Sequence, residues 1–262
     1  MTLNFSKARI PILFGSLVLV IIVWWIVAVS SGFSGYPGPV GTGLAFVQLF
    51  TTHSLSSLLV SALGTTMYEV VLGFVLAIAV GFPVGVLMGR YVLIDNMLDP
   101  WVNAWYSIPA IAFIPLTMNW TGLTSTSAMI ISFLIATFMI IINTYTGVKN
   151  VSRNTIEPAL AFGSSGRQAL TKVILPASLP QIMVGLRLGI TRAIDGVIIA
   201  EMVFSVSGLG GMIFDTADKV QLNLAVALVI ILSVIGLAVN EIMKYLSKKA
   251  VPWKETEAMF RQ

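Results

Sequence analysis

EPALAFGSSGRQALTKVILPASLP, residues 157–180, is the longest polar segment between the apolar runs of this chain. Its spacing predicts one short helix that ends at Gly163 and a second helix that begins after Ser165. Ser165 and Gln168 have the spacing of a capping box, in which each side chain bonds the backbone N–H of the other residue. A polar helical hairpin of this kind either offers a binding surface to another protein or only connects two apolar runs.

The ends of this hairpin depend on other residues. Asn154 or Thr155 is expected to cap the first helix, so that Pro158 falls in the first turn, where a missing N–H costs little. Pro176 and Pro180 are expected to change the direction of the chain before the next apolar run begins. The whole loop is expected at residues 150–176.

The composition indicates an all-α polytopic membrane protein. Of the 262 residues, 57% are hydrophobic and 10% are charged. Apolar runs of about 20 residues, the length that spans a bilayer, recur along the chain. A β-barrel would require alternating strands, and these runs are continuous. The net charge of +4 does not indicate nucleic acid, because the charges cluster at the ends of the runs.

The sequence carries no signature of an enzyme. It has no cysteine, which excludes disulfides and thiolate metal sites, and we expect no metal site. GSSGR at residues 163–167 lacks the GxxxxGK[ST] pattern of a phosphate-binding loop, and neither HExxH nor a nucleophile elbow is present. If ATP drives an activity of this chain, another chain must hydrolyse it.

Six spans are expected, together forming a single transmembrane domain. A signal peptide is the alternative for the first run, but that run is long and contains Trp24 and Trp25. Between the first two spans, residues 44–59 are expected to form a surface helix on which His53 is solvated. The expected spans cover about residues 11–30, 63–88, 100–118, 127–146, 177–204 and 222–243.

Lysine and arginine predict the orientation of these spans. With the N-terminus inside, the inner segments hold two, one, four and five of the 15 basic residues. Arg187 and Arg192 lie within a span, and only Lys219 lies outside. Both termini and the loop at 150–176 are therefore expected on the cytoplasmic side.

The second span and the loops carry further signals. Gly81, Gly85 and Gly89 repeat every four residues, a spacing that lets a neighbouring helix approach closely. Pro83 is a candidate kink that packing in a bilayer tolerates. Glu69, near the outer end, is either a functional residue or an interfacial one. Residues 90–99 are expected to form a short inner loop, and residues 208–211 a flexible outer loop.

The fifth span is unusual because it contains Arg187, Arg192, Asp195 and Glu201. Charges inside a membrane are expected to face protein or a water-filled path, so these four are candidates for a translocation path or gate. Arg187 and Glu201 fall within roughly 40° of one another around a helix. Arg192 and Asp195 are three residues apart and can pair. For Arg187, the alternative to a gate or an anion site is a bond to loop carbonyls of its own subunit.

Segment 157–180 resembles the cytoplasmic EAA loop of permease subunits in binding-protein-dependent ABC importers. The matching residues are Glu157, Ala159, Gly163, Ile174 and Pro176, whereas Pro158 departs from the usual first alanine. Five further motifs resemble permeases of the nitrate, sulfonate and taurine importers, and the likeness covers about residues 37–243. These motifs are SIPAIAFIPL at 107–116, INTYTGVKN at 142–150, GLRLG at 185–189, IAEM at 199–202 and SGLGGMI at 207–213.

The resemblance implies a type I ABC importer permease fold and a homodimer in the inner membrane of a prokaryote. It also implies two cytoplasmic ATPase subunits that bind ATP and Mg, and an external substrate-binding protein. Alternating access would then import a small solute: an anion, a sulfonate, a carboxylate or a vitamin precursor. The residues implied in the ATPase groove are Ala161, Phe162, Gly163, Ser164 and Ser165, with Arg167 as a candidate for a salt bridge or carbonyl contact.

Two other functions remain open at this stage. An ion-coupled secondary transporter could use the charges of the fifth span as a relay, but the sequence shows no convincing inverted repeat. A purely structural membrane subunit fits poorly with a span that carries four charges.

Overall fold

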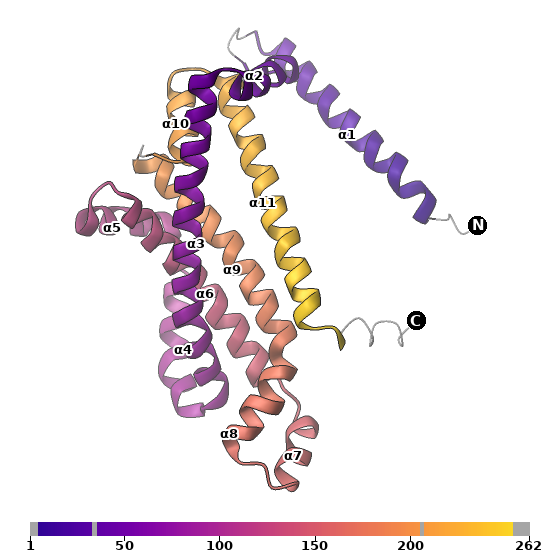
Figure 1. The fold of residues 1–262 in the computed structure, drawn as a ribbon, viewed down its shortest axis with the longest axis vertical. Helices are drawn as coiled ribbons and strands as arrows, with labels where there is room; N and C mark the ends of the chain where they lie inside the picture. Colours follow the sequence, from indigo (N-terminus) through magenta and orange to yellow (C-terminus); the bar gives the residue numbers. More distant parts are fainter. Residues whose placement is uncertain (1–4, 33–35, 205–206, 254–262) are drawn as a thin grey trace.

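The computed structural model describes residues 5–32, 36–204 and 207–253, and these residues form helices and no strands (Figure 1). Among them, four helical stretches are long and apolar enough to cross a membrane: α3 (His53–Arg90), α6 (Ser125–Lys149), the stretch Gly166–Phe204 that ends in α9 (Leu175–Phe204), and α11 (Leu222–Ala250). The expectation of an all-α membrane protein is confirmed. The number of six spans and the orientation stay predictions.

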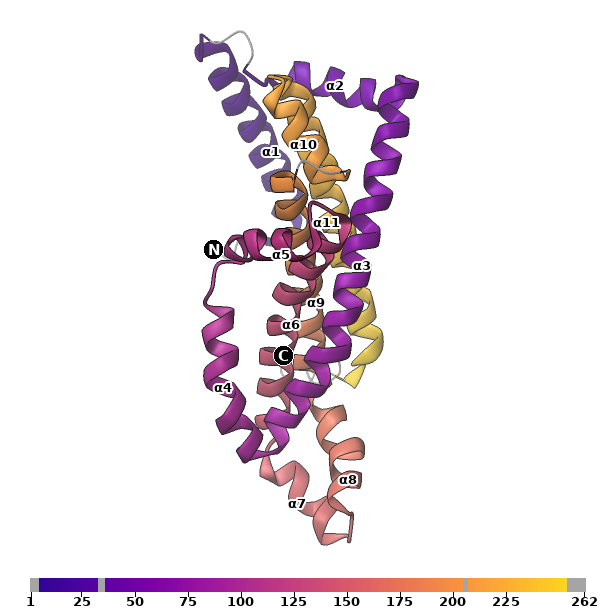
Figure 2. The ribbon, with the colours of Figure 1, turned by 90° about the vertical axis from the view of Figure 1, so that its left-hand side faces the viewer.

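The N-terminal part forms two helices. α1 (Phe5–Ser30) covers the expected first span and stands apart from the other helices (Figure 1). Trp24 Nε1 donates a hydrogen bond of 2.9 Å to the carbonyl of Pro37, which ties α1 to the residues before α2. α2 (Pro39–Thr51) lies across one end of the molecule (Figure 2).

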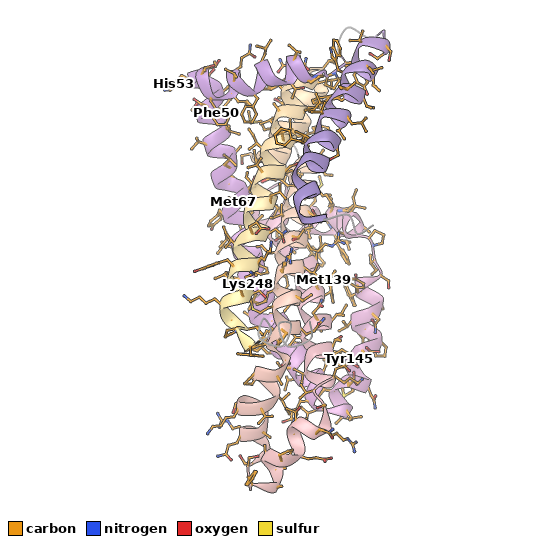
Figure 3. The ribbon with its side chains drawn as sticks, turned by 90° about the vertical axis from the view of Figure 1, so that its right-hand side faces the viewer. Phe50, His53, Met67, Met139, Tyr145 and Lys248 are labelled. Carbon is orange, nitrogen blue, oxygen red and sulfur yellow. The ribbon has the colours of Figure 1, made fainter. Side chains whose placement is uncertain are left out.

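The expected surface helix at 44–59 is wrong, because the chain breaks at Thr52, whose backbone is extended. α2 ends before this break, and α3 begins directly after it, ten residues ahead of the expected second span at 63. His53 is exposed at this corner, as expected for a solvated residue, and lies at the edge of the molecule (Figure 3).

The expected third span is not one continuous helix, and whether residues 100–118 cross the membrane stays a prediction. α4 (Val92–Tyr106) ends before Pro109, and the short helices η1 (Ala110–Phe113) and α5 (Ile114–Thr121) follow. Pro109 has an extended backbone, with φ −57° and ψ 130°, and proline cannot donate to a helical ladder. As a result α5 runs across the direction of α6 instead of extending α4 (Figure 2).

Two expected loops prove to be helical. Only Tyr91 separates α3 from α4, so Asp95 and Asp99 lie on a helix and not in an inner loop. The expected flexible loop at 208–211 is the start of α10 (Leu209–Asp218), in which Gly210 and Gly211 are buried. Both helices carry apolar residues that pack, and this favours helix over loop in each case.

Glycine lets α3 and α6 pack closely, as the four-residue repeat predicts. A Cβ atom on Gly81 would lie 3.0 Å from the carbonyl oxygen of Thr137, and one on Gly85 would lie 2.8 Å from that of Ile141. Gly89 is equally close to α6, where a Cβ would lie 2.6 Å from Val148 Cβ. The backbones of the two helices therefore touch along this line. α3 is one continuous helix through Pro83.

A shared core joins α3, α6 and α9. Ala77, Ala136, Ile140, Ala193 and Val197 are completely buried in it. α9 also uses glycine against α6, because a Cβ on Gly185 would lie 2.6 Å from Asn143 Cβ. These three helices form the rigid centre on which the polar hairpin and the charged face of α9 are placed.

Candidate functional site

The polar hairpin projects beyond the long helices, at the end opposite α2 (Figures 1 and 2). It consists of α7 (Arg153–Ala161), a turn, and α8 (Gly166–Ala169), and a π-helical turn at Leu170–Ile174 then leads into α9. The elements thus follow the expected order within residues 150–176.

The turn of the hairpin confirms the expected helix ends. Gly163 has φ +82°, a left-handed conformation that favours glycine and stops α7. Ser164 closes the turn, because its hydroxyl donates a 2.6 Å hydrogen bond to the carbonyl of Ala159. In the capping box, the Gln168 N–H donates to Ser165 Oγ at 3.3 Å and the Ser165 N–H donates to Gln168 Oε1 at 2.8 Å. The tip is therefore a rigid shape.

The expected start of the hairpin is wrong. α7 begins at Arg153 after Ser152, so neither Asn154 nor Thr155 caps it, and Pro158 lies inside the helix instead of in its first turn. The first turn forms earlier because Ser152 has an extended backbone and its hydroxyl bonds that of Thr155 at 2.8 Å.

The expected change of direction at Pro176 and Pro180 is also wrong. α9 begins at Leu175 and continues through both prolines. The π-helical turn that precedes them takes an extra residue into the helix, and such turns adjust a ladder at places where it would otherwise break.

The tip of the hairpin presents an apolar side chain to solvent. Phe162 is 92% exposed, and Leu160 beside it is 48% exposed. A bare aromatic side chain on a rigid turn is typical of a surface that another protein covers. The other expected coupling residues surround it: Glu157, Ala161, Gly163, Ser165 and Arg167 are exposed, and Ala159 and Ser164 are partly buried.

The base of the hairpin is fixed to the membrane helices. Val86 of α3, Val148 of α6 and Ile174 form a small buried cluster against which the partly buried Ile156 of α7 packs. This packing joins the hairpin to the ends of α3, α6 and α9.

An ion pair at the same level attaches α4 to α6. Lys149 Nζ lies 2.8 Å from Asp95 Oδ2 and also donates a hydrogen bond to the hydroxyl of Tyr145. The hydrogen bond from Lys149 holds the pKa of Asp95 below its usual value. Figure 3 shows Tyr145 near the end of α6, beside α4. Sequence analysis missed this pair, since its partners are 54 residues apart.

The charged face of α9 borders an open cavity of about 590 Å³. α9 contributes Arg192 and Asp195, α11 contributes Ser233 and Asn240, and Ala110 of η1 closes one side. A second hollow of about 240 Å³, which Trp105 of α4 helps to line, shares Ala110 and Arg192 with the first. The break at Pro109 therefore brings η1 against α9, an arrangement that a continuous third span would not give.

Three of the four candidate path residues lie on this side of α9. Arg192 Nη1 lies 3.3 Å from Asp195 Oδ2, which confirms the expected pair. Arg187 Nε donates a 2.6 Å hydrogen bond to Asn240 Oδ1 of α11, so its partner is a side chain and not the expected loop carbonyl. Asn240 is one of the few polar residues in the apolar run of α11, and this is the signal that sequence analysis overlooked.

Glu201, the fourth candidate, lies apart from Arg187 and is 1% exposed. Thr66 Oγ1 of α3 donates a 2.7 Å hydrogen bond to Glu201 Oε1, and the N–H of Gly210 donates a 2.7 Å bond to Oε2. Glu69 of α3, three residues after Thr66, is also 1% exposed. The interfacial role considered for Glu69 is therefore wrong, because the side chain is buried between helices.

The fold and these two surfaces define a permease subunit of an ABC importer. Residues 81–251 match the family described as "Binding-protein-dependent transport system inner membrane component". The chain belongs to this family, as the resemblance of its motifs implies.

Relatives and a solved structure agree with this assignment. The chain is 39% identical to a putative ABC transporter permease protein of Methanocaldococcus jannaschii, over 71% of this chain and 70% of that protein. It is 33% identical to the putative aliphatic sulfonates transport permease protein SsuC of Bacillus subtilis, over 84% of this chain and 78% of that protein. A chain of the MetNI methionine ABC transporter, solved in inward-facing conformations, aligns with a TM-score of 0.61 at 22% identity, covering 74% of this chain and 99% of that chain. This likeness shows the type I importer permease fold.

Proposed function

We propose that this chain forms a homodimer that imports a small solute by alternating access, with two separate ATPase subunits docked on its hairpins. ATP and Mg would be bound by those subunits, and an external binding protein would deliver the solute. The observation that carries this proposal is Phe162, a 92% exposed aromatic side chain on a turn that Gly163 and the capping box hold rigid. A rigid, bare aromatic anchor suits a groove on a partner.

The solute is proposed to be a small anion, and a sulfonate is a favoured case. The cavity beside α9 carries Arg192, its partner Asp195, and Asn240, whose other contact is Arg187. This region contains two guanidinium groups and one carboxylate, so its net charge is positive and attracts anions along a path. The relative named for aliphatic sulfonates supports this class.

Phe162→Ala tests the docking proposal. An aromatic anchor is worth about 2 kcal/mol or more at an interface, so we expect ATPase affinity to fall about thirtyfold and solute-stimulated ATP hydrolysis to be lost. Tyr245→Ala is the matched control, because Tyr245 is a 66% exposed aromatic residue on α11, away from the hairpin. Normal ATPase binding by the Phe162 variant would refute the docking role.

Gly163→Asp tests the shape of the turn. A Cβ at Gly163 meets no atom within 4 Å, so folding should survive, and the strain of φ +82° and the added charge both fall on the docking surface. We expect stable insertion without solute-stimulated ATP hydrolysis. Full stimulation in an assembled complex would refute the coupling role of this turn. Transport that an uncoupler abolishes would favour the ion-coupled alternative.

Arg187→Gln and Arg187→Lys test the path. Glutamine can keep a hydrogen bond to Asn240 but has no charge, whereas lysine keeps the charge without the planar guanidinium. If the charge attracts the solute, transport at matched membrane abundance should fall about tenfold or more in the Gln variant, and the Lys variant should keep part of it. Equal transport by both variants and the wild type would exclude Arg187 from the path.

A further inference from the structure

Glu201 acts as an N-terminal cap for a helix other than its own. α10 begins at Leu209, and the N–H of Gly210 in its first turn donates to Glu201 Oε2 at 2.7 Å. The N–H of Leu209 donates to Thr66 Oγ1 at 2.9 Å, and the Thr66 hydroxyl in turn donates to Glu201 Oε1 at 2.7 Å. A carboxylate in this place is stabilised by the free N–H groups and by the dipole of α10.

The hydrogen bonds around Glu201 show which groups donate and which oxygens accept. The Thr66 oxygen accepts from Leu209, so its own hydrogen points to Glu201, and Gly210 supplies a donor to the other carboxylate oxygen. Both oxygens of Glu201 therefore accept, and these two donors at the N-terminus of α10 favour the ionised form of Glu201. A further group that bonds an ionised Glu201 must bring a hydrogen of its own.

Glu69 is that further group. Thr66, which bonds Glu201, lies three residues before Glu69 on α3, so the two side chains share one face of that helix. Glu69 is 1% exposed, and its Oε2 atom has no partner among the described residues. The groups that donate to Glu201, the Thr66 hydroxyl and the Gly210 N–H, are neutral, and within the described chain neither acid forms an ion pair. Two adjacent carboxylates without a cation would be strongly unfavourable at this burial.

We propose that Glu69 and Glu201 share one proton, which Glu69 holds and donates to the Glu201 carboxylate, and that this acid–carboxylate pair ties α3 to the start of α10. The pair thus couples α3, α9 and α10 into one unit at the end of the molecule opposite the hairpin. A protonated Glu69 fits this hydrogen-bond pattern, because it supplies the hydrogen that an ionised Glu201 lacks.

The glycines of the segment SGLGG fit the same arrangement. Gly208 has φ +151°, and a Cβ on it would collide with the Glu201 carboxylate. A Cβ on Gly210 would lie 2.5 Å from the carbonyl oxygen of Ile198. The backbone therefore closes around the carboxylate and leaves no room for side chains at these two positions.

The proposal predicts opposite outcomes for two isosteric substitutions. Glu69→Gln supplies an amide donor in place of the acid hydrogen, so it should preserve the link. Glu201→Gln puts an amide group against the hydroxyl of Thr66 or the N–H of Gly210, so one donor loses its acceptor and the cap should fail. Thr66→Ser should behave as wild type, and Thr66→Val should resemble Glu201→Gln.

Opening of α10 can be measured by thiol labelling, because the chain has no cysteine of its own. Thr216→Cys places a thiol at a buried position of α10 that is 6% exposed. In the assembled transporter, we expect Glu201→Gln to accelerate labelling about tenfold or more and Glu69→Gln to change it less than about twofold. Asp215→Asn is the matched control, since its ion pair with Lys219 is on the surface of α10.

Infrared spectroscopy tests the proton itself. The purified protein should show the carbonyl band of a protonated carboxylic acid, which Glu69→Gln removes and Asp215→Asn leaves in place. Persistence of that band in the Glu69 variant would overturn the proposal. Equal acceleration of labelling by Glu69→Gln and Glu201→Gln would overturn it as well, because it would show that the two acids have the same protonation state.

Discussion

Replacing Gly85 by alanine should force α3 away from α6. The new Cβ would lie 2.7 Å from Thr144 Cβ and 2.8 Å from the carbonyl oxygen of Ile141. The oxygen belongs to the backbone of α6, so a side-chain rotation cannot relieve the contact. Carbon atoms prefer a separation of about 3.5–4.0 Å, and the helices must therefore move apart by about 1 Å.

Gly64, a second glycine of α3, serves as the reference position for this substitution. A Cβ on Gly64 would meet no atom within 4 Å, so Gly64→Ala changes only the helix propensity, which favours alanine by about 1 kcal/mol. Gly85→Ala gains the same propensity and also overpacks the interface, at a cost of about 1–3 kcal/mol. The difference between the two variants isolates the packing cost.

Thermal unfolding in detergent, followed by the loss of monodisperse protein on size-exclusion chromatography, measures this difference. For a chain of this size, we expect the midpoint of Gly85→Ala to lie about 2–10 °C below that of Gly64→Ala. Equal midpoints, or a higher midpoint for Gly85→Ala, would show that the two backbones do not touch as described.

Two further predictions concern the ends of the membrane helices. Since the Lys149 ammonium lowers the pKa of Asp95, the ion pair contributes stability near neutral pH, and this stability is lost as the pH falls through the pKa of Asp95 in the folded protein. Asp95→Asn should therefore be about 1 kcal/mol less stable at neutral pH, and its stability should depend less on acid pH. Unchanged unfolding midpoints would contradict this. For topology, cysteines at Gly43 and Asp218 should react with an impermeant external reagent and a cysteine at Ser164 should not, and the reverse pattern would overturn the orientation. Gly43 is suitable because a Cβ there meets no atom within 4 Å.

The hairpin was predictable because its signals are local. A left-handed glycine and a capping box act over four residues, and both Gly163 and the Ser165–Gln168 pair adopt the expected geometry. The start of α7 was missed because several polar residues in a row can cap a helix, and the choice of Ser152 depends on how Ile156 packs against Val148 and Ile174.

Residues 100–118 show that an apolar run does not by itself predict one continuous helix. Residues 100–118 are apolar enough to cross a membrane, yet Pro109 ends the helix and α5 turns across α6. Proline is tolerated inside α3 and α9, where neighbouring helices hold the chain, so the residue type alone does not decide the outcome. Packing of η1 against α9 decides it, and no local pattern records that contact.

The sequence by itself determined the class of protein, its helical content, the hairpin turn, the glycine line of α3 and the family. These depend on composition, on spacing within a few residues and on motifs, all of which are local properties of the chain. Only the tertiary structure decided the long-range partners of these charges. Arg192 and Asp195 pair within one helix, but Arg187 meets Asn240 53 residues away, and Glu201 meets Thr66 135 residues away. Such partners are set by which helix faces touch, because an isolated charge in an apolar run specifies that a partner must exist and not which residue supplies it.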